Sequence, residues 1–260
     1  TLGKTTSLVL STPSNTISPY SSRSDAYYLQ GAAATVALGQ HIDLTSFVSY
    51  RKIDATLNSD GSIKTLLHTG YHRTMSEMRR KHNSSQLATG LSLRWRKDGL
   101  HFGANAIYTS FNRELHPNTT QLFRKYDPAG NNFHTGSIDY GFINHRININ
   151  GETAINNNGA IATLNSLSLK ANSSLTLTAI QRYYSYRYYS LLGASFSDGG
   201  KVQNESGVYI GAAWTPLARL SILAYTDFAY FPWARYTASL SSHSWDNMVQ
   251  ATYNLSMKTN

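Results

Sequence analysis

Residues 91–108 have the sequence LSLRWRKDGLHFGANAIY, and this stretch decides the fold. In its first half apolar and polar side chains alternate, so that Leu93 and Trp95 stand on either side of Arg94. The alternation stops at Lys97-Asp98-Gly99 and resumes from Leu100. A period of two is that of a β-strand with one apolar and one polar face, and Asp-Gly between two such runs is a hairpin signal. The stretch therefore predicts an antiparallel hairpin with two chemically different faces.

The same pattern recurs along the chain and predicts about twelve strands. They are residues 4–10, 26–38, 41–57, 84–96, 100–113, 133–143, 146–155, 160–170, 174–188, 206–215, 218–231 and 247–257. Most of them reach the roughly 9–11 residues that a tilted strand needs to cross a bilayer.

The predicted connections alternate between short and long. The short ones are Gly39-Gln40, Lys97-Asp98-Gly99, Asn144-His145, Ala171-Asn172-Ser173 and Pro216-Leu217. The long ones are residues 11–25, 59–83, 114–132, 189–205 and 232–245, and a brief Asn156-Asn157-Asn158-Gly159 fills one further long position. Tight turns at one end and long loops at the other are typical of an outer-membrane barrel.

The composition agrees with this fold. Charged residues make up 14% of the chain, against about 25% in soluble domains. No apolar run approaches the roughly 18 residues of a membrane-spanning helix, whereas a closed barrel can cross a membrane because its strands satisfy each other's backbone groups. The chain has no cysteine, which excludes disulfides, thiol catalysis and thiolate metal sites.

We therefore predict an all-β fold, an antiparallel transmembrane β-barrel of the outer-membrane type. Residues 1–260 form a single domain that is either a whole barrel or part of a larger one; a soluble all-β protein is the alternative.

A lipid-facing Arg near the membrane midplane costs about 2–4 kcal/mol, so Arg94 and Arg219 should face the lumen, together with Asp227. Aromatic residues near strand ends, such as Trp95 and Tyr108, predict interfacial girdles, although a carbohydrate-binding platform is an alternative.

The longest predicted loop carries a basic cluster. Thr74 and Glu77 have capping-box spacing, which predicts a short helix in residues 74–82. The cluster consists of Arg73, Arg79, Arg80 and Lys81. With a net charge of +9, the chain is expected to meet outer-membrane lipid and lipopolysaccharide phosphates; nucleic acid is the alternative anion, and protein partners in a membrane complex are also considered.

No catalytic motif is present. The chain lacks H-E-x-x-H, G-x-S-x-G and a phosphate-binding glycine loop, so we predict no enzyme, no catalytic residue and no cofactor. His68 and His72 have a metal-ligand spacing on a helix, but His68 lies in a strand-like stretch, so no metal site is predicted. An outer-membrane lipase that uses Ser and His is the enzymatic alternative.

Several short motifs resemble a protein family of the Bacteroidetes. They are Ser49-Tyr50-Arg51-Lys52-Ile53-Asp54-Ala55, Gly70-Tyr71-His72-Arg73-Thr74 with Ser76-Glu77, Arg182-Tyr183-Tyr184, Phe196-Ser197-Asp198-Gly199, Val202-Gln203-Asn204-Glu205, Gly207-Val208-Tyr209-Ile210-Gly211, and Phe231-Pro232-Trp233 with Arg235-Tyr236. Their order and spacing over most of residues 26–240 are similar to the β-barrel region of large outer-membrane helix-hairpin-helix domain-containing proteins, which carry a module like the competence DNA receptor.

The resemblance implies an outer-membrane location and a longer full-length protein. No helix-hairpin-helix repeat is present, so a DNA-binding role is assigned to no residue here. The start at Thr1 and the end at Lys258-Thr259-Asn260, without a terminal aromatic residue, are expected of an internal fragment.

The leading functional hypothesis is a channel or transport-type barrel for solutes or a polymer. The alternative is a structural or assembly scaffold that anchors a periplasmic module and has a link to DNA uptake.

Overall fold

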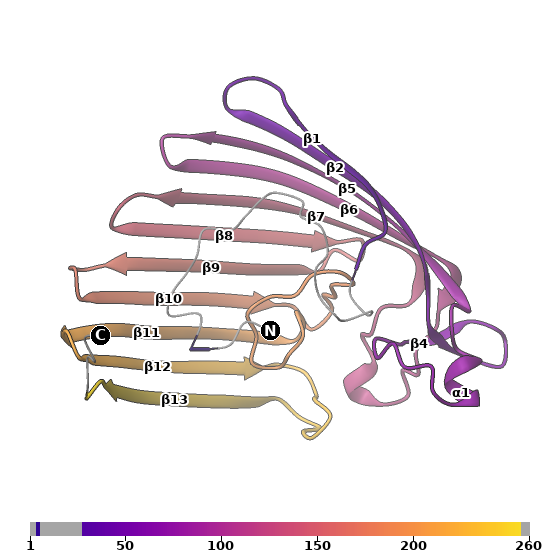
Figure 1. Cartoon of the computed structure of the whole chain (residues 1–260). Coiled ribbons are helices and arrows are strands. Elements are labelled where there is room, and N and C mark those ends of the chain that lie inside the picture. Colours follow the sequence, from indigo (N-terminus) through magenta and orange to yellow (C-terminus); the bar gives the residue numbers. More distant parts are fainter. Residues whose placement is uncertain (1–3, 6–27, 256–260) are drawn as a thin grey trace.

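The computed structural model describes residues 4–5 and 28–255, and its regular structure is almost entirely β (Figure 1). The strands are β1 Gly31–Ala37, β2 Ile42–Ile53, β3 Ala55–Leu57, β4 Ile63–Leu66, β5 Ser84–Lys97, β6 Leu100–Leu115, β7 Gly130–Ile143, β8 Ile147–Asn156, β9 Ile161–Lys170, β10 Leu175–Tyr184, β11 Glu205–Leu217, β12 Leu220–Phe231 and β13 Ser242–Tyr253. Two short helical turns complete the described elements, α1 Met75–Met78 and the 3-10 turn η2 Leu122–Arg124.

Successive strands pair with each other in an up-and-down order. The sheet runs β1-β2-β5-β6-β7-β8-β9-β10-β11-β12-β13, and all the neighbours on this path are antiparallel. β3 and β4 form a small hairpin off this path. Short turns lie at one end of the sheet, on the left of Figure 1, and the long connections lie at the other end with α1 and β4. The predicted all-β fold with the strand order of an outer-membrane barrel is confirmed.

The described sheet is open. In residues 28–255, β1 pairs only with β2 and β13 only with β12, so the two edge strands do not meet. Figure 1 shows a single curved layer in which the strand direction changes steadily from β1 to β13. This is the right-handed twist of neighbouring strands accumulated over the sheet.

One face of the sheet is apolar and exposed. Because directly opposed residues share a face, the register places Leu93 beside Ala104 and Leu167 beside both Ile149 and Ala179. The large exposed side chains of this face include Val36, Val48, Leu91, Leu93, Phe102, Ile138, Ile149, Leu167, Leu177, Val208, Ile210, Phe228 and Val249. We call it the apolar face.

The opposite face, here called the polar face, carries the charged side chains of the main strand path. They are Asp43, Arg51, Arg94, Arg96, Arg113, Asp139, Glu152, Lys170, Arg182, Glu205, Asp227 and Asp246. Among the described residues of that path, the charges on the apolar face are Lys52, Lys97 and Glu114, each within two residues of a strand end. Apart from these strand-end positions, the alternation predicted from the sequence thus separates charge from hydrocarbon along the main strand path.

Aromatic side chains border the apolar face at both ends. Trp95, Trp214 and Tyr253 lie toward the short turns, whereas Tyr183 and Tyr230 lie toward the long connections. The predicted gathering of aromatic residues near strand ends is therefore present, with an uncharged region between the two borders, but the prediction is wrong for Tyr108, which lies in the middle of β6.

The buried apolar core lies at the loop end and on the polar face. One cluster joins the β3–β4 hairpin to β6 and β7 through Ile53, Ala55, Ile63, Phe111, Leu115 and Phe133. Tyr189 and Leu191 of the long β10–β11 connection pack against it. The loop end is therefore a packed cap and not a set of independent loops.

Four predicted boundaries are wrong. The strand expected over 41–57 breaks at Asp54, whose carboxylate accepts one hydrogen bond from the His82 backbone N–H and lies 2.5 Å from His72 Nε2. The loop expected over 59–83 contains β4, and the last strand begins at Ser242 and not at residue 247. In addition, β10 ends at Tyr184, four residues before its predicted end.

The turn expected at Pro216-Leu217 is displaced. Both residues belong to β11, where the register shifts between Trp214 and Leu217, and the chain turns at Ala218-Arg219. Proline lacks a backbone N–H and is tolerated in sheets at such irregularities. The predicted strand over 4–10 falls on residues 4–5, which form a turn, and on residues outside the described part, as do residues 26–27 and 256–257 of two other predicted strands.

Within the described residues, no helix is long and apolar enough to cross a membrane. The predicted capping box is confirmed: the Glu77 N–H donates to Thr74 Oγ1, and the Glu77 carboxylate accepts the Thr74 N–H. The resulting helix is a single turn.

Candidate functional site

A buried ion network occupies the polar face of β10, β11 and β12. The guanidinium of Arg182 donates from Nε to Glu205 and from its two terminal nitrogens to Asp227, at 2.8 and 3.2 Å. The side chains of all three residues have no exposed surface. The two carboxylates thus give each of the three guanidinium nitrogens a hydrogen-bond partner, and such pairing is required of buried charge.

Neighbouring residues shape the space for the guanidinium. A Cβ at Gly207 would lie 2.6 Å from Arg182 Cζ, so glycine is needed where β11 passes the arginine. The ring of Phe196 covers the group from the loop side, with its centroid 5.0 Å from Arg182 Cζ. The arginine is thereby held between a strand and a loop.

The network fastens the β10–β11 connection to the sheet. Glu205 accepts the backbone N–H groups of Asp198 and Gly199, each at 2.8 Å. Lys4 Nζ lies 2.7 Å from Asp198, 3.0 Å from Asp227 and 2.9 Å from Asp246. Burial alone would raise the pKa of Asp198, but the hydrogen bond and charge of Lys4 outweigh it, and the pKa lies below its usual value. Asp198 is therefore a carboxylate at neutral pH.

The long connections also hold each other. The Asn204 side chain exchanges two hydrogen bonds with the Trp233 backbone, at 2.9 and 2.7 Å. Gln203 Nε2 donates to the carbonyls of Tyr126 and Tyr186, both at 3.0 Å. The rings of Tyr126, Tyr186 and Trp233 pack together with centroids 5.0–5.5 Å apart. Residues from three loops thus form one layer over the end of the sheet.

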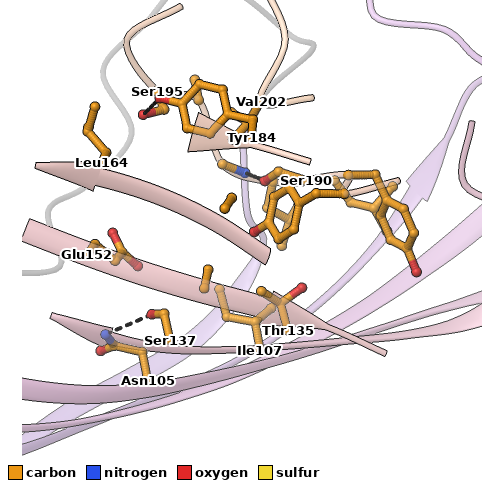
Figure 2. Close-up of a pocket in the computed structure, with 18 of the residues that line it drawn as sticks. Asn105, Ile107, Thr135, Ser137, Glu152, Leu164, Tyr184, Ser190, Ser195 and Val202 are labelled. Carbon is orange, nitrogen blue, oxygen red and sulfur yellow. Dashed lines mark hydrogen bonds between the residues drawn. The ribbon is translucent and has the colours of Figure 1, made fainter. Parts of the chain in front are cut away.

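A pocket of about 200 Å³ lies beneath this cap, between the polar face of β6–β10 and residues 188–195. Figure 2 shows Asn105, Thr135 and Glu152 rising from the strands toward it. Tyr184 borders it on the loop side, where its hydroxyl donates to the Phe196 carbonyl at 2.7 Å. The pocket is lined mainly by apolar atoms, with a few polar groups from the strands.

Two of the three predicted lumen residues lie on the polar face, and the third does not. Arg94 lies on the polar face, 2.8 Å from Asp139, and Asp227 lies there in the buried network. Arg219 does not, because it occupies the exposed turn after β11. The displaced turn at the Pro216 irregularity explains this difference.

The predicted basic cluster is exposed at the loop end. Arg73 packs on Tyr71, with Cζ 4.1 Å from the ring centroid, and lies 3.9 Å from Glu77. The side chains of Arg79, Arg80 and Lys81 are exposed and make no hydrogen bond or ion pair with the described residues. His72 contacts Asp54, and the described residues contain no group of three or more ligands placed for a metal ion.

Arg182 and Glu205 were missed as a pair by pattern analysis. Each lies in a short motif that the sequence shows, but their contact depends on the register between β10 and β11, in which Arg182 stands opposite Gly207. A signal that could have found this pair is the position of opposite charges on the same face of neighbouring strands, because buried charges require partners.

The comparisons identify no family. No family model and no curated protein matches the chain. Among solved structures, two mutant forms of the ferric enterobactin receptor of Pseudomonas aeruginosa align with 75% of this chain at 11% and 12% identity, each with a TM-score of 0.44. The chain spans about a third of those structures, 33% in each case. A likeness at this level identifies no function.

Replacement of Arg182 by methionine should destabilise the protein strongly. The change leaves Glu205 buried without its cation and Asp227 with Lys4 as its remaining cation, and breaking a buried pair in this way costs about 3–5 kcal/mol. Arg124→Met is the control, because it breaks the partly exposed pair with Asp127 and should cost about 1 kcal/mol or less. The free energy of unfolding by urea, measured for both variants in detergent, checks both values. An equal loss of free energy in the two variants would show that the buried network contributes no more to stability than the partly exposed pair.

Proposed function

We propose that this chain forms a wall of a transport-type β-barrel in the bacterial outer membrane. The apolar face then meets lipid, and the polar face lines the interior through which solutes pass. The observation that supports this most is the separation of the two faces over the whole main strand path. A soluble protein would gain nothing from leaving Val36, Ile138 and Val249 between 53% and 78% exposed.

The dimensions of the apolar face suit a bilayer. The ten residue steps from Leu220 to Tyr230 extend about 33 Å at 3.3 Å per residue. A strand tilt of about 40° reduces this height to about 25 Å, which is the height of the apolar band of outer-membrane barrels. The aromatic residues at the two ends of the face then lie at the headgroup level, as in interfacial girdles.

The open edges of the sheet require further strands in a membrane. Backbone N–H and C=O groups without partners cost several kcal/mol each in hydrocarbon. We therefore propose that the outer edges of β1 and β13 pair with strands beyond those described here, and that the described sheet is part of a larger closed barrel.

The interior proposed here is balanced in charge. Its strands carry six basic residues, Arg51, Arg94, Arg96, Arg113, Lys170 and Arg182, and six acidic ones, Asp43, Asp139, Glu152, Glu205, Asp227 and Asp246. The excess positive charge of the chain, +9, therefore lies elsewhere. We assign part of it to an outer surface at Arg73, Arg79, Arg80 and Lys81 that contacts lipopolysaccharide phosphates.

An arginine on the apolar face tests the membrane orientation. Leu167 pairs with Ala179, midway along β10, so Leu167→Arg places a charge near the middle of the band. The expected loss is about 2–4 kcal/mol of folding free energy in lipid vesicles. Ser168→Arg, on the polar face of the same strand, is the matched control and should cost much less. If Leu167→Arg does not lower the folding free energy and the new arginine side chain is exposed to water, the result would favour a soluble protein.

A scaffold role is the second candidate function. It is favoured by the cap over the loop end and by the buried ions that fix residues 198 and 199 to the sheet, because a transport path must stay open. The two functions differ in conductance: the full-length protein in a planar bilayer should pass ions if it is a transport barrel. Absence of any pore, together with stable co-purifying partners, would leave the scaffold role.

A further inference from the structure

The carboxylate of Glu152 projects into the pocket beneath the cap without a counter-ion. Figure 2 shows it on β8, directed toward the space between the strands and the loop. It makes no ion pair or hydrogen bond among the described residues, and the residues that line the pocket include no Lys, Arg or His. Among the described residues that line the pocket, Glu152 is the only acidic one.

The other carboxylates of the polar face are paired. Asp43 contacts Arg96, Asp139 contacts Arg94, and Asp246 contacts Lys4. Glu205 and Asp227 share Arg182, as described above. Within the described part of the polar face, Glu152 is therefore the exception to a consistent pairing of charge.

Most other polar groups of the pocket already have partners. The Tyr184 hydroxyl bonds to Phe196, Ser190 Oγ accepts the Gly193 N–H at 2.9 Å, and Asn105 donates to Asp139 at 2.8 Å. The hydroxyls of Thr135 and Tyr188 make no hydrogen bond among the described residues and can also meet a polar group of a ligand. Among the described residues of the lining, however, Glu152 alone carries a charge, so the pocket selects for a cation.

The remaining walls are aromatic and aliphatic. Phe133, Tyr184 and Tyr188 line the pocket together with Ala154 and Ala162. Tyr188 and Glu152 line the same pocket, so the negative charge lies beside the ring. Burial raises the pKa of Tyr188 to about 12, and the charge of Glu152 acts in the same direction. Aromatic faces close to a carboxylate favour an organic cation, because the ring quadrupole and the charge attract the same group.

We propose that this pocket binds a small organic cation, an amine on an apolar body of about one ring, with Glu152 as its counter-ion. A cavity of about 150 Å³ is enough for benzene, and the pocket here is about 200 Å³. The proposal rests on the proposed transport function, to which it adds a class of solute. It requires that solutes can reach the polar face.

Benzylamine, benzyl alcohol and benzoate are suitable probes because they share a ring and differ in charge. Titration calorimetry on the detergent-solubilised chain should give the affinity order benzylamine, benzyl alcohol, benzoate. Glu152→Gln should weaken benzylamine about tenfold to hundredfold, as expected for one lost hydrogen bond to a charged group, and should change benzyl alcohol little. Glu114→Gln, which removes an exposed carboxylate away from the pocket, is the matched control.

A second variant keeps the test informative. Ala154→Leu fills the pocket without changing its charge, so it should weaken both benzylamine and benzyl alcohol. The proposal is overturned if wild-type protein with native near-ultraviolet circular dichroism does not bind benzylamine at millimolar concentration, or if Glu152→Gln binds it unchanged. Binding without conductance would contradict transport alone, and conductance without binding would contradict this inference alone.

Discussion

The two-residue period of the strands is the constraint on which the rest of the structure depends. Because alternate side chains point to opposite faces, one sequence pattern determines both what meets hydrocarbon and what meets the interior. Leu93 and Arg94 are neighbours in sequence yet lie on opposite faces of one sheet. A shift of one residue in pairing would move Arg94, Arg182 and Asp227 to the apolar face together, so the register is strongly specified.

Charge on the polar face has a structural consequence. Arg182 cannot remain buried alone, and the two carboxylates that neutralise it come from β11 and β12. The Glu205 carboxylate also accepts hydrogen bonds from the backbone N–H groups of Asp198 and Gly199, and these bonds hold that part of the loop. Pairing within the strands therefore positions a loop, and that loop in turn forms the roof of the pocket over Glu152. Function and stability depend on the same groups here.

The sequence predicts the strands well and their contacts poorly. Leu91 to Tyr108 gives a hairpin because period and turn are visible in consecutive residues, and Thr74 with Glu77 gives a capped turn for the same reason. Arg219 was misplaced because Pro216 sits at an irregularity that continues β11 past the expected turn. Arg182 and Asp227 are 45 positions apart, and the pocket depends on irregular residues 188–195; neither contact has a local signal.

The central claim is that one face of the sheet meets lipid and the other meets water. The chain has no cysteine, so single cysteines can be placed at successive positions of β9, from Ala162 to Leu169, and spin-labelled in lipid vesicles. Collision with oxygen dissolved in the bilayer should be high at odd-numbered positions such as Leu167, and collision with a water-soluble nickel complex should be high at even-numbered ones such as Ser168. Equal access of the nickel complex to both sets would contradict the account.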